Sequence, residues 1–460
     1  MSRSERLSVL DELFLHLEGP NTHMHVGGVA VFEGPAPSWQ EVLAGVQSRL
    51  PLVPRFRQKL LTIPYGIGRP IWVDDPHFNI AHHLRQTSLP APGDEGALKE
   101  LVAQIMSRQL DRAKPLWEMW FVDGLIDDRF AVISKTHHCV VDGVSGTDIM
   151  SVLMDTDRET RLVPPQTTWD PAPEPTSDQL MADALAERLT SPAEVWRSVQ
   201  SALLDRSNLP GKIAGGARAL AAFVGGSLDF APPTSLNQAI GPDRRFETVL
   251  ADLDAFRRIK RRLNGTVNDV VLSVVTGGLG QLLRSRGERT DELELRAMVP
   301  VSVRTQEART AGNRLAALWA PLPVSEEDPV ERLRQLVYRM KNLKGSGQAV
   351  GAQLLTRIGE YAPSTVLAQA ARIVARQRAF NLVITNVPGP QLPLYLMGRQ
   401  MQEVYPVLPL SDNTTLGVAL LSYNGTIGFG FLGDRDAAPD LAVLAEGVEK
   451  SIAELVAATS

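Results

Sequence analysis

A proline-rich stretch between residues 162 and 177 divides the chain into two regions in which helices and strands alternate. Its prolines are Pro164, Pro165, Pro171, Pro173 and Pro175. Such a density is typical of a linker or a crossover. The 460 residues are enough for two or three domains at roughly 150 residues each. We therefore expect an α/β protein with an N-terminal lobe over 1–160, a crossover with helices over 161–243 and a C-terminal lobe over 244–460.

The first region has clear start and stop signals. A capping box at Ser38-Trp39-Gln40-Glu41 opens a helix that ends before Pro51. Apolar spacing predicts further helices over 7–17, 97–110 and 144–154, and strands over 26–32, 117–122 and 130–136. The crossover has helical spacing over 178–189 and 193–204.

The second region begins near residue 244. Its apolar spacing predicts helices over 253–263, 267–283 and 439–456, and strands over 295–301 and 382–387. Two further strands, over 416–423 and 426–432, flank Asn424-Gly425, which is a strong signal for a tight hairpin turn.

Composition excludes several classes of protein. A single cysteine, Cys139, excludes an intramolecular disulfide and a multi-cysteine zinc site. The net charge of −5 argues against a nucleic-acid-binding protein. Asp11 and Glu12 stand where a signal peptide has its apolar stretch, and no run approaches the roughly 18 apolar residues of a membrane span. We expect a cytoplasmic protein that can still bind a membrane surface.

The sharpest chemical pattern is His137-His138-Cys139-Val140-Val141-Asp142-Gly143, between a predicted strand and a predicted helix. Imidazole can take up and return a proton near neutral pH. Neighbouring residues in an extended chain point to opposite faces, so only one of the two histidines can readily face a given cavity. Asp142 and Gly143 can shape the turn that aims that ring. The alternative is two structural histidines and an aspartate that caps the next helix.

Other candidates carry weaker patterns. His82-His83 is followed by Leu84-Arg85-Gln86-Thr87, without the Asp-Gly, and indicates a structural pair. His23 and His25 share one face of a strand, but no nearby carboxylate or cysteine completes a metal site. We expect no metal. Cys139 could be a nucleophile beside a histidine, but neighbouring side chains in an extended chain diverge, so His138 could not easily activate it. We therefore interpret Cys139 as a buried thiol.

The histidine motif resembles the active-site motif of the CoA-dependent acyltransferase superfamily. More closely, the chain resembles the bacterial wax ester synthase/acyl-CoA:diacylglycerol acyltransferase family almost from end to end. Besides the histidine motif, the matching elements are Leu10-Asp11 with Leu15, Pro115-Leu116-Trp117, Pro233-Thr234-Ser235-Leu236-Asn237, Asn268-Asp269, Pro300-Val301-Ser302-Val303-Arg304, Asn386-Val387-Pro388-Gly389-Pro390 and Gly433-Asp434-Arg435-Asp436. The combination of these elements is specific, although the histidine motif alone is shared by several families.

This resemblance implies a two-lobed fold like that of chloramphenicol acetyltransferase, with a channel between the lobes that meets at His138. His138 would be the general base, with His137 and Asp142 as supports. Arg304 is the candidate partner of Asp142, unless it is an ordinary surface arginine. Acyl-CoA is implied as co-substrate, without a permanently bound cofactor.

The resemblance also gives candidates for substrate binding. Asn268 and Asp269 either cap a helix or lie near the reacting centre. Asn386 begins a rigid turn that either has a structural role, shaping the tunnel wall, or contributes to substrate binding. The basic run 257–262, which includes Arg258 and Arg261, is either a solvated helix face or a site for CoA phosphates or anionic lipid. The crossover segment 213–224 either packs against the protein or lies at a lipid interface.

The expected reaction is transfer of a long acyl group from acyl-CoA to diacylglycerol or a fatty alcohol. Both acceptors are poorly soluble, so we expect peripheral association with membranes or lipid droplets. The negative net charge gives no reason to expect a nucleic-acid partner. One alternative is a condensation-type enzyme or an acyltransferase for a polyketide alcohol, from the same superfamily. Another is a non-catalytic protein of the lipid-droplet surface.

Overall fold

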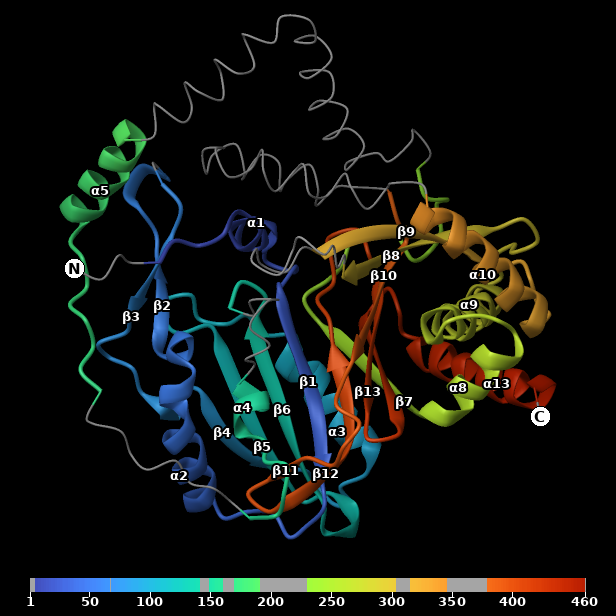
Figure 1. The fold of residues 1–460 in the computed structure, drawn as a ribbon, viewed down its shortest axis with the longest axis horizontal. Coiled ribbons are helices and arrows are strands. Elements are labelled where there is room, and N and C mark those ends of the chain that lie inside the picture. The colour runs from blue at the N-terminus through green and yellow to red at the C-terminus, as the bar shows by residue number, and fades with distance from the viewer. Residues whose placement is uncertain are drawn as a thin grey trace, which may run out of the picture.

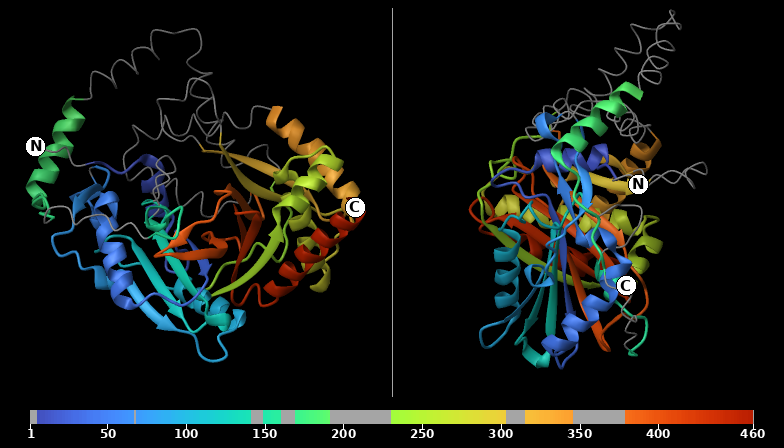
Figure 2. Two further views of the ribbon diagram at one scale, coloured as in Figure 1. Left: turned by 60° about the horizontal axis from the view of Figure 1, so that its bottom comes forward. Right: turned by 90° about the vertical axis from the view of Figure 1, so that its left-hand side faces the viewer.

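The computed structural model describes residues 5–66, 68–140, 149–159, 169–190, 230–302, 315–345 and 379–459. Two six-stranded sheets form the centres of two lobes, and a separate two-stranded sheet lies beside the first. The lobes lie next to each other, with blue and cyan elements on one side and most of the yellow and red elements on the other (Figure 1 and Figure 2). This arrangement has the two-lobed α/β form that the sequence predicts.

The first sheet has the strand order β11-β12-β1-β6-β5-β4. These strands are β1 (His25–Phe32), β4 (Leu84–Ser88), β5 (Trp117–Asp123), β6 (Phe130–His137), β11 (Tyr395–Leu396) and β12 (Arg399–Val407). Its helices are α1 (Val9–Leu17), α2 (Trp39–Arg49), α3 (Glu95–Met106) and α4 (Ile149–Leu153). Every residue of β6 is buried, so this central strand is a rigid support for the histidine motif at its end.

The second sheet has the order β7-β14-β13-β10-β8-β9. Its strands are β7 (Arg244–Asp252), β8 (Glu294–Ser302), β9 (Leu315–Pro323), β10 (Leu382–Pro388), β13 (Leu416–Tyr423) and β14 (Thr426–Asp434). Its helices are α8 (Leu253–Arg262), α9 (Val267–Ser285), α10 (Pro329–Gly345) and α13 (Leu441–Thr459). They gather on the side of this sheet that faces away from the first lobe (Figure 1). The largest apolar core of the described chain lies between this sheet and these helices.

Two strands of the first sheet, β11 and β12, come from the second half of the chain. β12 pairs with β1 in antiparallel register, with Gly28 opposite Pro406, so part of the segment 244–460 completes the first sheet. Glycines in β14 permit the close packing of β12 on the second sheet. A Cβ atom added to Gly428 or Gly430 would lie 1.9 Å from the carbonyl oxygen of Val404 or Pro406, respectively. The contribution of this segment to the first sheet was not predicted from the sequence.

The local signals seen in the sequence are present in the structure. Ser38 and Glu41 form a reciprocal capping box on α2. Asn424 and Gly425 both have positive φ, 42° and 88°, as the hairpin turn requires. Several elements were missed, however: the hairpin of β2 (Gln58–Leu61) and β3 (Ile71–Asp74), and also β4, β7, β9, α10, β11 and β12. The crossover helix α5 (Ser177–Thr190) matches the expected 178–189, whereas the expected helix 193–204 lies outside the described residues.

Within the described ranges, no single helix has the length and apolar character needed to cross a bilayer. The pair α8 and α9, bent by 101°, passes that test only when its two helices are taken together. Most of α9 is buried in the core of the second lobe.

Candidate active site

The two histidines of the motif stand at the end of β6, where the backbone is anchored from two sides. The amide of His137 donates to the carbonyl of Leu116 at 3.0 Å, and the amide of His138 donates to the carbonyl of Met24 at 2.7 Å. Leu116 belongs to the Pro-Leu-Trp motif, in which Trp117 begins β5. The conformation of the histidine pair is therefore set by two neighbouring segments as well as by its own strand.

His137 and His138 differ in their surroundings. His137 is completely buried, whereas His138 is partly exposed. The ring of His138 is stacked on that of Phe14 from α1, with 4.0 Å between the centroids. Its Nδ1 is enclosed and has no hydrogen bond to another of the residues that the structure describes. Nε2 is therefore the nitrogen of His138 that can reach a substrate.

The burial of the His138 ring also sets its protonation. Burial lowers the pKa of His138, and a contact with its own backbone partly offsets that effect. Desolvation disfavours the charged imidazolium, so the neutral ring is the form present near pH 7. A neutral ring with an accessible nitrogen is the form that can accept a proton from a hydroxyl group.

His137 has its own fixed partners. Its Nδ1 accepts the backbone N–H of Cys139 at 3.1 Å and lies 2.9 Å from the Cys139 sulfur. The proton of the neutral ring is therefore on Nε2, which faces Glu18 Oε2 at 3.7 Å. Burial lowers the pKa of His137 to about 3, so the ring is neutral. Burial also raises the pKa of the Cys139 thiol, which leaves Cys139 protonated and unsuited to nucleophilic attack.

The carboxylate of Glu18, at the end of α1, is a site residue that was not predicted from the sequence. Its side chain is 1% exposed, and it receives a hydrogen bond from Arg112 Nε at 2.8 Å and a second one from Nη2 of the same guanidinium group. His25 Nε2 lies 3.3 Å from the other carboxylate oxygen. Burial opposes ionisation of Glu18, but His25, His137 and Arg112 together lower its pKa to about 2.

This cluster corrects one expectation. No carboxylate was expected close to His25, but folding brings Glu18 to it from the preceding helix. The register of β1 and β6 also places His25 directly opposite His137. A glutamate just after a predicted helix end carried no sequence signal that distinguished it from an exposed residue. Within the described ranges, no group of three or more His, Cys, Asp or Glu side chains is arranged to hold a metal ion.

The second tandem pair, His82-His83, has a packing role in the structure. His83 is buried, and its Nδ1 lies 2.9 Å from the carbonyl oxygen of Trp117. Its ring is stacked between Trp117, at 4.6 Å, and Phe78, at 5.2 Å. These contacts support the structural interpretation of this pair.

Two sequence motifs of the second lobe meet in space. Asn386, near the end of β10, donates from Nδ2 to Asn268 Oδ1 at 3.4 Å. Asp269 forms the capping box of α9 with Thr266, and its Oδ2 accepts the backbone N–H of Thr266 at 2.8 Å. Asp269 thus has the helix-capping role that the sequence left open, whereas Asn268 and Asn386 form a polar pair at the start of that helix.

Arg258 and Arg261 lie in a different part of the molecule. They belong to α8, which packs against α9, α13, β7 and β14 and lies beyond the second sheet from β6 (Figure 1). Arg258 is 54% exposed and lies 3.5 Å from Asp252. The structure therefore does not bring these arginines to His138.

Three other predicted site residues, Asp142, Gly143 and Arg304, lie outside the described residues, as does the crossover segment 213–224. Their roles stay predictions.

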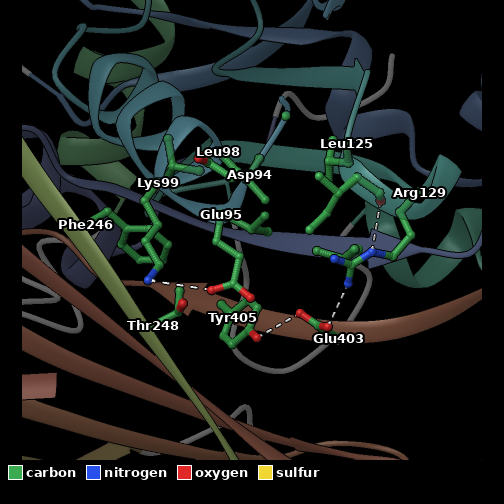
Figure 3. Close-up of a pocket in the computed structure, with 15 residues that line it drawn as sticks. Asp94, Glu95, Leu98, Lys99, Leu125, Arg129, Phe246, Thr248, Glu403 and Tyr405 are labelled. Atoms are coloured by element: carbon green, nitrogen blue, oxygen red, sulfur yellow. Dashed lines mark hydrogen bonds and ion pairs between the residues drawn. The ribbon is translucent and has the colours of Figure 1, made fainter. Parts of the chain in front are cut away.

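Two cavities lie away from the histidine motif. The first, between α3, β1, β7 and β12, has a volume of about 30 Å³ and holds little more than one water molecule. Some of its polar side chains are paired with one another: Arg129 and Tyr405 bind Glu403 at 3.1 and 2.8 Å (Figure 3). The second has about 440 Å³ and is lined by Leu50, Arg57 and Phe78 among others. The expected channel at His138 stays a prediction.

The fold and the histidine site define a class of protein. The chain aligns over 99% of its length with the first condensation domain of the calcium-dependent antibiotic synthetase, with a TM-score of 0.58 at 18% identity and 97% of that chain covered. It aligns better with the wax ester synthase/diacylglycerol acyltransferase from Marinobacter aquaeolei VT8, with a TM-score of 0.72, 27% identity and 99% of both chains covered. The fold is thus that of the CoA-dependent acyltransferases.

The family is established by the sequence comparisons. Residues 7–271 match the wax ester synthase/diacylglycerol acyltransferase catalytic domain, and residues 311–456 match the WS/DGAT C-terminal domain. A probable diacylglycerol O-acyltransferase of Mycobacterium tuberculosis, tgs1, is 35% identical over 98% of this chain and 96% of its own length. The chain belongs to the WS/DGAT family of acyltransferases.

Proposed function

We propose that this protein transfers a long-chain acyl group from acyl-CoA to the hydroxyl group of diacylglycerol, a fatty alcohol or both. The observation that carries the proposal is the placement of His138, a partly exposed imidazole that directly follows β6 and has an enclosed Nδ1. The relatives support the substrate class, because one of them bears the name probable diacylglycerol O-acyltransferase. A more distant relative, the starter condensation domain of rhizomide synthetase, was solved in complex with C8-CoA.

The chemistry needs one base and no covalent intermediate. Nε2 of His138 takes the proton of the acceptor hydroxyl as the oxygen attacks the thioester carbonyl carbon. When the tetrahedral intermediate collapses, the carbon–sulfur bond breaks, and the same nitrogen returns the proton to the CoA thiolate. The products are an ester and free CoA. The burial that lowers the pKa of His138 favours the second transfer, because a weakly basic imidazole readily returns its proton.

The acceptors imply where the enzyme works. Diacylglycerol and long alcohols partition into membranes or lipid droplets, so we propose reversible binding of the protein to such surfaces in the cytoplasm. The basic run on α8 supports this proposal, since Arg257 and Arg258 are 41% and 54% exposed. Their carboxylate neighbours Asp254 and Asp252 reduce the local positive charge, so we expect moderate rather than tight electrostatic binding.

The test is an acceptor panel with purified protein. Palmitoyl-CoA is offered with hexadecanol, with dioleoylglycerol or with a primary amine of equal chain length, and free CoA is measured with a thiol reagent. The proposal expects CoA release and ester formation with at least one hydroxyl acceptor, and loss of both in His138→Ala. Release with the amine alone would favour a condensation-type enzyme. No acceptor-dependent release at all would favour a non-catalytic lipid-surface protein.

A further inference from the structure

The buried carboxylate of Glu18 has a place in the site that helix packing alone does not explain. A buried anion is costly unless cations or hydrogen-bond donors surround it. Arg112, whose side chain is 49% exposed, binds Glu18 from the solvent side. On the inner side the carboxylate faces His25 and His137. Glu18 therefore lies between a surface arginine and the first histidine of the motif.

The contact of Glu18 with His137 has a definite direction. Because Nδ1 of His137 accepts the Cys139 amide, the Nε2–H group must point towards Glu18. Its separation of 3.7 Å from Oε2 is an electrostatic contact, longer than a hydrogen bond. Nε2 is buried and has no hydrogen-bond partner among the described parts of the chain. The negative charge of Glu18 thus stabilises the one orientation of His137 in which its other nitrogen can bind the turn.

The contact with His25 is less specific. Nε2 of His25 lies 3.3 Å from Glu18 Oε1 and 3.4 Å from the amide nitrogen of Leu110. A neutral ring nitrogen either donates or accepts a hydrogen bond, so it can serve only one of these partners at a time. His137 has no such choice, because its Nδ1 is committed to Cys139. The directional effect of Glu18 is therefore on His137.

We infer that Glu18 is a positioning residue: through the ring of His137 it holds the turn 137–139 in the shape that presents His138. The inference rests on the proposed function, in which His138 is the base. The side chain of Glu18 is 1% exposed, and its described ionic contacts are with Arg112, His25 and His137 rather than with His138. Its removal should therefore lower the turnover number kcat and leave the KM values of both substrates unchanged.

The chain supplies a matched control for this test. Glu12 lies in the first turn of α1, whose C-cap is Glu18; it is also 1% exposed and pairs with His16 at 3.4 Å. His16 is 32% exposed and is outside the histidine motif. Glu12→Gln and Glu18→Gln thus make the same chemical change at equal burial, beside two different histidines.

The experiment measures kcat and KM with palmitoyl-CoA and the best hydroxyl acceptor. We expect Glu18→Gln to lower kcat about 10- to 100-fold, the range found for groups that orient a functional histidine in metal sites. Glu18→Asp, which keeps the charge, should recover part of that loss. Glu12→Gln should keep the wild-type kcat. The melting temperature of each variant, measured at the assay pH, shows that the protein is folded.

A double-mutant cycle separates positioning from independent effects. His137→Asn offers an oxygen acceptor to the Cys139 amide but has no group in the place of Nε2. If Glu18 acts through His137, the Glu18→Gln/His137→Asn double variant should be no slower than the slower single variant. Multiplied losses, or an unchanged kcat in Glu18→Gln, would overturn the inference while the active wild type upholds the proposed function. An inactive wild type, in contrast, would refute the proposed function itself.

Discussion

The stacking of Phe14 on His138 gives a prediction about the pH dependence of the reaction. Burial lowers the pKa of His138, and the Phe14 ring, 4.0 Å away between centroids, is part of the apolar cover. Phe14→Ala admits water to the imidazole and raises its pKa towards the ordinary value of about 6.5. The acid limb of the plot of kcat/KM against pH, which reports this group in the free enzyme, should move to higher pH.

The size of the effect can be worked from the contact. An aromatic pair contributes about 0.5–1.5 kcal/mol beyond its buried area. Loss of that energy lowers the fraction of molecules in which His138 has the productive orientation by roughly 2- to 10-fold. At pH 8 the base is neutral in both proteins, so only this positional loss remains. Near pH 6 protonation adds to it, and Phe14→Ala should be impaired further. In the wild type, His138 is neutral above its lowered pKa and becomes protonated as the pH falls through that value.

The assay is initial-rate CoA release from pH 5 to 9 in wild type and Phe14→Ala, with Leu10→Ala as control. Leu10 is on the same helix and 45% exposed, so its truncation should leave the profile unchanged. An acid limb at the same pH in Phe14→Ala and wild type would refute the view that this ring sets the pKa of the base. An acid limb displaced to lower pH would refute it as well.

Three further predictions concern the base, the contact between the lobes and the lipid surface. His138→Ala should lower turnover by roughly 10²–10⁴-fold with an unchanged melting temperature; near-normal activity there, with activity lost in His137→Ala, would reverse the two roles. Gly430→Val should lower the melting temperature, measured by calorimetry, by several degrees, because the new Cβ meets the carbonyl of Pro406 and overpacking costs about 1–3 kcal/mol. Gly19→Ala, where a Cβ has nothing within 4 Å, should leave the melting temperature unchanged. The protein should sediment with anionic liposomes at low salt and be partly released at high salt, because the screening length falls from about 10 Å at 0.1 M to about 3 Å at 1 M; equal binding to neutral liposomes at all salt concentrations would exclude an electrostatic contribution.

Local sequence signals predicted much of the fold. The capping box at Ser38 begins a helix in the structure, the predicted helix 267–283 is present as α9, and the Asn424-Gly425 turn joins β13 to β14. These features depend on residues within four positions of one another, so the sequence displays them directly. The pairing of β12 with β1 depends on residues from opposite ends of the chain, such as Gly28 and Pro406. Periodicity within either strand carries no information about its partner.

The candidate site, too, was predicted from the sequence only where the signal is local. The motif identified His137 and His138, and alternation along an extended chain predicted that their rings diverge. Phe14 and Glu18 lie against these rings because α1 packs across the end of β6, and Arg112, from the segment between α3 and β5, binds Glu18. The sequence could show Glu18 as a charged residue after a helix, but not as a buried one. The pairing of Asn268 with Asn386 likewise joins two motifs that no spacing rule connects.

The segment between α1 and β1 connects this site to the second lobe. Met24 accepts the amide of His138, and three residues earlier Asn21 donates to the carbonyl of Ile240 at 3.0 Å and accepts a hydrogen bond from the buried Arg244. Thr22 donates to Asp412, in the loop between β12 and β13. The backbone that holds His138 is therefore held in turn by the other lobe. The position of the base therefore depends on how the two lobes pack. β12 fixes that packing, because it pairs with β1 in the first sheet and packs on β14 of the second.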